Sequence, residues 1–201
     1  MNKGEERATV FNLAVLPQIN NIKSHFNAIL VQIEDKNTEE DVFTDSFPLI
    51  MKKSFLITIY SILEKELSKV TQFAEFSSNS TLKINDLRHR GIFRDYNYLT
   101  KVIGIKLPSD VWKKIRTYNR IRNFFIHEIK VVLTFKEVQQ LSNKSVPFIE
   151  FKSSGDDRYV IKDIGSEIIY DFLETVEIFL KSVWIALEEG GHIHKRGNKE
   201  N

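Results

Sequence analysis

Apolar side chains recur at helical spacing along most of this chain, and this pattern limits the fold more than any other feature. Large apolar residues return every three or four positions over residues 7–34, 46–76, 110–128 and 164–188. Such spacing places them on one face of each helix, and that face must be buried against a neighbouring helix. The chain is therefore predicted to be all-α.

Helix boundaries follow from prolines and capping residues. Pro17 is expected to kink or split the first helix, while residues 34–46 are acidic and unpatterned, which indicates an exposed loop. Ser46 is predicted to cap the second helix, with Pro48 in its first turn. A proline followed by serine and aspartate at 108–110 marks the start of the fourth helix.

A shorter helix over residues 92–103 and a β-hairpin complete the prediction. The hairpin pairs 146–152 with 158–161 across a glycine-containing turn. The fold class is thus an up-and-down bundle of about five helices with a small β-hairpin inserted before the last helix. We expect one domain over residues 1–189 and a disordered tail over 190–201, where His192 and His194 have metal-like spacing without carboxylate support.

Composition narrows the class of protein. The 201 residues include no cysteine, which excludes thiol nucleophiles and thiolate metal sites and favours a reducing, cytoplasmic setting. No stretch reaches the roughly 20 apolar residues of a membrane span, and the N-terminus does not resemble a secretory signal. No nucleotide-binding loop or other cofactor motif is present, so no metal and no cofactor is predicted.

Positive charge is concentrated in one part of the chain. Residues 82–122 hold eleven Lys and Arg against three Asp, a net charge of +8, although the whole chain carries only +2. A polyanion such as RNA would be held there, but a solvated basic helix face explains the charge as well. Tyr96 and Tyr98 in this block are expected to pack between helices. The candidate RNA contacts are Arg88, Arg90, Lys113, Arg116 and Arg120.

The predicted helix over 110–128 has one residue on an unexpected face. Around its axis, Asn123 and His127 continue a polar stripe, whereas Arg122 falls in the middle of the apolar face. An arginine keeps its charge, so at that position it needs an anionic partner. Three alternatives remain open: a structural ion pair with Glu64 or Glu66, a side chain whose charged end reaches water, or a cleft in which Arg122 binds a phosphate.

These three polar residues have the chemistry for RNA cleavage. A neutral imidazole can take a proton from a ribose 2′-hydroxyl, a guanidinium can stabilise a pentavalent phosphate, and the Asn123 amide can orient either group. A histidine near a helix C-terminus also simply stabilises the helix dipole, so His127 alone decides nothing. Arg122 and His127 lie about 140° apart around an ideal helix. Convergence on one atom therefore needs a deformed helix or a second copy of it.

The run Arg122-Asn123-Phe124-Phe125-Ile126-His127 resembles the signature of the HEPN superfamily, the higher eukaryotes and prokaryotes nucleotide-binding domains. The resemblance implies a homodimer formed through the motif helix and a metal-independent endoribonuclease that leaves 2′,3′-cyclic phosphate ends. It makes Arg122 and His127 catalytic and Asn123 a supporting residue.

The same resemblance implies a biological setting. Such proteins commonly act as toxins of toxin–antitoxin pairs or in antiviral defence, with an antitoxin or a nucleotidyltransferase as partner. Members silenced by nucleotidylation carry a tyrosine two residues after the histidine, where this chain has Ile129. Other members bind nucleotides or protein partners without catalysis, so a non-catalytic interaction module is the alternative function.

Overall fold

The computed structural model describes residues 9–34, 42–127, 132–142 and 149–192. Within them it contains six α-helices and a three-stranded antiparallel sheet placed before the last helix. The predicted fold class, a helical bundle with a small β insertion, is confirmed. No helix in these described ranges combines the length and the apolarity that crossing a bilayer requires.

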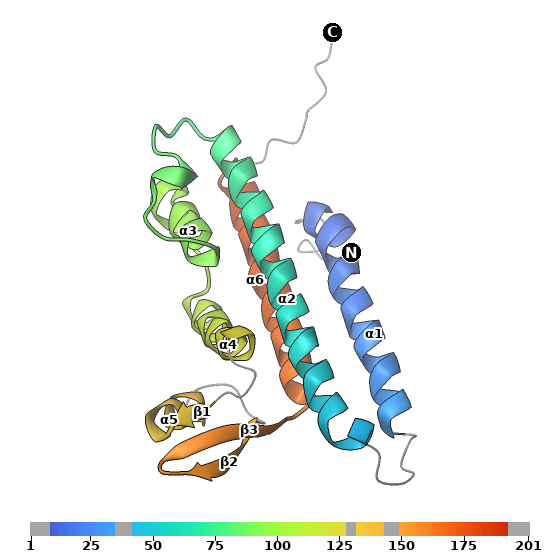
Figure 1. The fold of residues 1–201 in the computed structure, drawn as a ribbon. Helices are drawn as coiled ribbons and strands as arrows, with labels where there is room; N and C mark the ends of the chain where they lie inside the picture. Colours follow the sequence, from blue (N-terminus) through green and yellow to red (C-terminus); the bar gives the residue numbers. More distant parts are fainter. Residues whose placement is uncertain (1–8, 35–41, 128–131, 143–148, 193–201) are drawn as a thin grey trace.

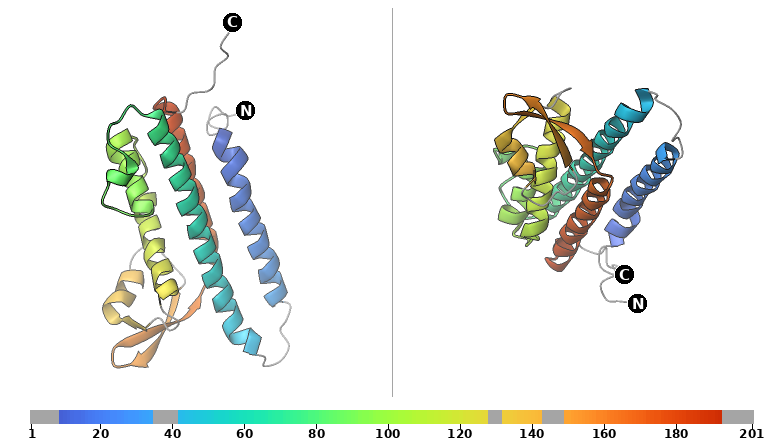
Figure 2. Two further views of the ribbon diagram at one scale, coloured as in Figure 1. Left: turned by 45° about the horizontal axis from the view of Figure 1, so that its top comes forward. Right: turned by 90° about the horizontal axis from the view of Figure 1, so that it is seen from below.

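Three long helices form the body of the molecule. They are α1 (Leu16–Glu34), α2 (Val42–Ser77) and α6 (Glu167–Glu189), which run side by side in Figures 1 and 2. Helix α1 packs on one side of the α2–α6 pair. The short α3 (Ile92–Asn97) and α4 (Ser109–His127), which is as long as α1, cover the opposite side.

The first predicted helix changes type just before Pro17. A π-helical turn over Phe11–Val15 leads directly into α1, and Pro17 is the second residue of α1. Proline has no amide hydrogen to donate to the preceding turn, and the single π-helical turn lies directly before it. The side-chain amide Nε2 of Gln18 donates to the Ala14 carbonyl at 2.6 Å. The helix is not split at Pro17, because the chain stays helical over residues 9–34. The kink stays a prediction.

Helix α2 begins earlier than predicted. It starts at Val42, so Ser46 is inside the helix and does not cap it, and Pro48 is an interior residue. The prediction was wrong because a proline removes one backbone hydrogen bond but does not have to end a helix whose far longer remainder is packed. Part of the expected acidic loop is therefore helical, while residues 35–41 lie outside the described residues.

The third predicted helix is present as two parts. The α-helix α3 is followed by a π-helical segment over Tyr98–Ile103, and Gly104, with φ of 84°, ends it. The Ile105 amide donates to the Leu99 carbonyl at 3.1 Å, as in a helix closed by a left-handed glycine. At the other end, Gly91 precedes α3 with φ of 56°.

The β insertion is larger than the predicted hairpin. Strands β2 (Ile149–Gly155) and β3 (Arg158–Ile164) form the hairpin, and β1 (Val132–Thr134) pairs with the other edge of β3, giving the order β1-β3-β2. Helix α5 (Phe135–Ser142) follows β1 directly. Residues 146–148 of the predicted first strand lie outside the described residues.

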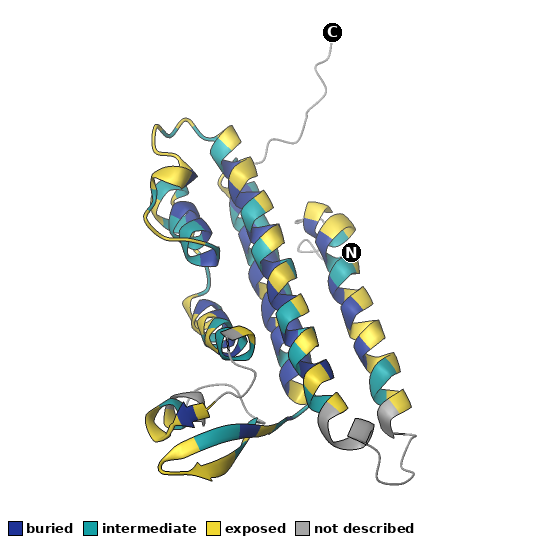
Figure 3. Cartoon of the chain, viewed as in Figure 1, coloured by how far each residue is buried: buried dark blue, intermediate teal, exposed yellow. Residues whose placement is uncertain are grey.

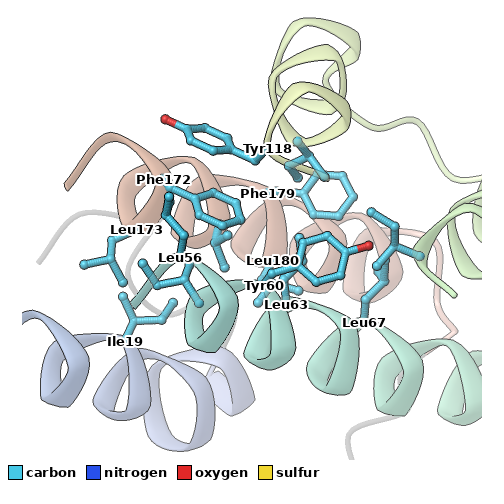
Figure 4. Packing of buried hydrophobic residues seen from close by; sticks show 14 of the residues in the cluster. Ile19, Leu56, Tyr60, Leu63, Leu67, Tyr118, Phe172, Leu173, Phe179 and Leu180 are labelled. Atoms are coloured by element: carbon cyan, nitrogen blue, oxygen red, sulfur yellow. The ribbon is translucent and has the colours of Figure 1, made fainter. Parts of the chain in front are cut away.

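One apolar core runs through the bundle, and its centre lies between α2, α4 and α6. Buried positions line the inner faces of these helices in Figure 3, while the outer faces of α1 and α4 are exposed. Figure 4 shows Tyr60 and Leu63 of α2 meeting Phe179 and Leu180 of α6, with Tyr118 of α4 above them. This packing fixes the face that α4 turns toward α2.

Of the tail predicted over residues 190–201, the structure describes residues 190–192. Helix α6 closes at Gly190, whose amide donates to the Ala186 carbonyl at 3.0 Å, and a turn carries the chain to His192. Residues 193–201, including His194, lie outside the described residues.

Candidate active site on helix α4

Helix α4 has the two faces that the sequence indicates. It begins at Ser109, and the Trp112 amide donates to the Pro108 carbonyl at 3.1 Å. Around the helix axis Trp112 falls on the same side as the polar stripe. It is nevertheless buried, because Tyr96 of α3 stacks on its ring with 3.9 Å between the ring centres. Tyr98 is fully buried. Both tyrosines therefore pack between helices, as predicted.

The five candidate RNA contacts all lie on the surface. Arg88 and Arg90 are exposed on the segment before α3, and three more cations are exposed along the polar stripe of α4: Lys113, Arg116 and Arg120. None of the five forms an ion pair with another described residue. They remain available to phosphates, and their role in RNA binding stays a prediction.

Arg122 lies against the core, on the face where the helical projection placed it. The side chain is half-buried, and its guanidinium carbon Cζ stands 4.9 Å from the centre of the Tyr60 ring on α2. Nη1 donates to Oδ1 of Asn123 at 3.0 Å, whereas Nε is buried without a hydrogen-bond partner. The structure thus brings Arg122 and Asn123 together.

The structural ion pair that was one alternative for Arg122 is absent from the described part of the chain. Glu66 is almost fully buried and is held by Lys69 at 2.7 Å. Glu64 forms no ion pair with Arg122 either, although its charge reaches Tyr60. Among the described residues, therefore, the positive charge of Arg122 faces an aromatic ring and an amide but is not neutralised by a carboxylate.

Tyr60 provides a neutral surface under the guanidinium. Burial of the ring raises the pKa of Tyr60 to about 12; the Glu64 carboxylate adds to the rise, and the Arg122 guanidinium opposes it. The phenol is consequently uncharged at neutral pH. Its contact with Arg122 is a cation–π interaction, worth about 0.5–2 kcal/mol.

A second cation, Lys53 of α2, lies beside the last turns of α4. Lys53 Nζ stands 5.2 Å from the centre of the Phe125 ring, and burial lowers the pKa of Lys53. Our reading of the sequence missed this residue. The signal was present, because Lys53, Tyr60 and Glu64 are seven and four positions apart and share one face of α2.

His127 is the last residue of α4, and the position of its imidazole is outside what the structure describes. Helix α4 stays α-helical from Ser109 through His127. Five regular positions still separate Arg122 from His127, about 140° around the axis. Within one chain the helix shows no deformation that brings the two residues onto a common atom.

A separate polar cluster joins α4 to α6. Asp171 accepts hydrogen bonds from Lys114 and from the Tyr118 hydroxyl. Burial raises the pKa of Tyr118, and the hydrogen bond to Asp171 raises it further. These residues form an internal tie between two helices, and sequence reasoning did not connect them because they lie more than fifty positions apart.

The described residues contain no group of three His, Asp or Glu side chains arranged to hold a metal ion. The site brings together the Arg122 guanidinium and the Asn123 amide, and the positive charge of the guanidinium favours an anionic ligand. Comparison with protein-family models, curated proteins and solved structures finds no match to this chain.

Proposed function

We propose that the protein is a metal-independent endoribonuclease of the HEPN type whose active site lies on α4. His127 takes the proton of a ribose 2′-hydroxyl, and the oxygen attacks the adjacent phosphorus. Arg122 stabilises the extra negative charge of the pentavalent phosphate, and Asn123 orients the guanidinium through the hydrogen bond between them. The P–O5′ bond breaks, the leaving oxygen takes the proton from the imidazolium of His127, and a 2′,3′-cyclic phosphate remains.

One observation carries this proposal: Arg122 is half-buried, and no described carboxylate neutralises it. A guanidinium kept in this state costs stability unless an anion binds. A phosphate supplies the missing charge and has oxygens that match the guanidinium donors in pairs.

The active site requires two copies of the chain. Because α4 is regular as far as His127, the deformed-helix alternative has no support in the described residues. Two α4 helices related by a two-fold axis bring Arg122 of one copy near His127 of the other. The exposed cations Lys113, Arg116 and Arg120 then border the cleft and guide the RNA backbone.

The test is cleavage of single-stranded RNA by the full-length protein in EDTA. Wild type is expected to yield 2′,3′-cyclic phosphate ends and to leave an all-2′-deoxy substrate intact, because that substrate lacks the nucleophile. Arg122→Ala and His127→Ala are each expected to lose about 10²-fold or more in rate. The matched controls Arg158→Ala and His25→Ala alter exposed residues of the same types and should cleave like wild type.

The cleavage assay also separates the proposal from its alternative. If wild type leaves RNA intact, or if the Arg122 and His127 variants cleave as fast as their controls, Arg122 belongs to a non-catalytic interaction module. The contacts with Tyr60 and Asn123 are the observation that favours this alternative, because they anchor the side chain without substrate. The toxin or defence role and the antitoxin or nucleotidyltransferase partner remain proposals that depend on activity.

A further inference from the structure

We propose that a cavity at the end of α2 binds one unpaired base of single-stranded RNA. The inference rests on the proposed function, since it assumes an RNA substrate, but it concerns a place that the proposed chemistry does not use. The cavity has a volume of about 500 Å³. Ligand sites commonly fall within about 300–1,000 Å³. A single base therefore fits with room for its sugar.

The cavity is formed by three segments. The last turns of α2 contribute Gln72 and Phe76, the short helical turn over 84–86 with the residue before it contributes Lys83 and Asn85, and α3 contributes Arg94. These side chains offer an aromatic ring, two amides and two cations, the groups that stack on a base and hydrogen-bond to its edges.

Phe76 is the feature that requires an explanation. Its side chain is 90% exposed, more than any other large apolar residue in the described part of the chain. A phenylalanine at the rim of a cavity adds nothing to the core, but it provides a flat face for a base. Stacking of this kind contributes about 1–3 kcal/mol for each base.

The walls are held in place before any ligand binds. Glu75 Oε1 accepts a hydrogen bond from the Ile84 amide at 2.7 Å, and Asp86 Oδ2 accepts one from the Lys83 amide at 2.7 Å. On the other side, the Tyr98 hydroxyl donates to the Leu82 carbonyl at 3.3 Å. A cavity with fixed walls loses little conformational entropy on binding.

The charges of the cavity favour a base over a phosphate. Lys83 and Arg94 are balanced by Glu75 and Asp95, so the lining has no net charge. Asp95 is almost fully buried, and its carboxylate lies 3.5 Å from the Arg94 Nε, so the two charges oppose each other directly. A neutral, hydrogen-bonding cavity attracts a phosphate weakly but matches the edge of a base.

The position of the cavity fits an RNA strand that continues toward the candidate active site. Arg88 and Arg90, both exposed, lie on the segment between the cavity wall and α3, where they can hold phosphates next to the bound base. Sixteen residues of α2 separate Phe76 from Tyr60, which is about 24 Å along a helix. Figure 1 shows α3 and α4 on the same side of α2, so the strand need not cross the bundle.

The experiment measures binding rather than cleavage. Full-length protein is titrated into a fluorescent single-stranded RNA made of 2′-O-methyl nucleotides, which cannot be cleaved because the 2′-hydroxyl is blocked. Phe76→Ala is expected to weaken binding about tenfold, within the range of one stacked base. The matched control is Phe73→Ala, one helical turn away, 43% exposed and not part of the cavity lining. It should bind like wild type, and Phe76→Trp should retain affinity.

A second probe identifies the ligand as a base. An oligonucleotide with the same phosphates but with abasic sugars is expected to bind the wild-type protein about tenfold more weakly than the intact strand does. The abasic strand should bind Phe76→Ala and wild type with equal affinity, because it has no base to stack. Equal affinity of the intact and abasic strands for wild type, or equal effects of the Phe76 and Phe73 variants, overturns the inference. If the protein does not cleave RNA but its binding depends on the bases, the nuclease proposal fails and the base-binding site stands. If the protein cleaves RNA whether or not Phe76 is replaced, and binding does not depend on the bases, the base-binding site fails and the nuclease proposal stands.

Discussion

Replacing Arg122 with methionine should make the protein more stable and remove its activity. Methionine keeps an unbranched stem to pack beside Tyr60 but has no charge and no buried donor. In the structure the Arg122 Nε is buried without a partner, and no described carboxylate balances the charge. A structural arginine gives the opposite expectation, so the sign of the change in stability separates the two roles.

The magnitude follows from one stabilising and two destabilising contributions. Relieving one buried, unpaired donor stabilises the fold by about 1–3 kcal/mol. Losing the cation–π contact with Tyr60, at 4.9 Å, costs about 0.5–2 kcal/mol. Losing the hydrogen bond from Nη1 to the half-buried Asn123 amide costs about 0.5 kcal/mol, because water can replace it there. The net expectation is a gain of up to about 1 kcal/mol, and a gain of about 1 kcal/mol corresponds to a rise in Tm of about 2–4 °C for a chain of this length.

The assay is urea unfolding followed by far-UV circular dichroism, with RNA cleavage measured on the same preparations. Arg120→Met is the matched control, because Arg120 is exposed on the same helix and its replacement should change stability by no more than about 0.5 kcal/mol. A loss of more than about 1 kcal/mol in Arg122→Met would refute the reasoning. The guanidinium would then stabilise the fold, and the observation that carries the proposed function would be removed.

Three further predictions test other parts of the structure. Burial raises the pKa of Tyr60 to about 12 in the folded protein. An unfolded tyrosine titrates near 10, so the free energy of unfolding should fall as the pH rises from about 10 to about 12. Tyr60→Phe should reduce this fall by about 1.4 kcal/mol for each pH unit, measured by urea unfolding at several pH values in that range. Asp171→Ala leaves the Tyr118 hydroxyl and Lys114 without their partner and should cost about 2–4 kcal/mol in thermal unfolding, whereas a change near zero would show that the cluster is not a tie between helices. Gly91→Ala must place a side chain at φ of 56°, with its Cβ 2.8 Å from a carboxylate oxygen, and should cost about 1–2 kcal/mol by chemical denaturation; an unchanged midpoint would contradict this.

The sequence was sufficient for the long helices because their stability depends on a repeated pattern. The apolar periodicity of α4 and α6 placed both within a few residues of their observed bounds. The start of α2 was misplaced at Ser46 because local capping rules do not register how much packing the rest of a long helix contributes. Strand β1 has three residues, too few for a period, and it forms only because β3 offers an edge.

The candidate site was predictable where it depends on one helix. The angular position of Arg122 indicated a cation on an apolar face, and the half-buried side chain confirms that position. What faces it was not predictable, because Tyr60 and Lys53 come from another helix, about sixty to seventy positions earlier in the chain. The ion pairs expected with Glu64 or Glu66 also depend on the rotation of α2 about its axis, which no local pattern determines.

The pairing of α2 with α6 has a consequence for how the chain is made. The two helices bury one another, yet roughly a hundred residues separate them in the sequence. At about 5–20 residues per second of synthesis, the apolar face of α2 waits on the order of 5–20 s before its partner leaves the ribosome. During that interval Leu63 and its neighbours are exposed apolar surface, which is prone to aggregation. The bundle, with the candidate site that α2 and α4 form between them, is completed only when nearly the whole described chain has emerged.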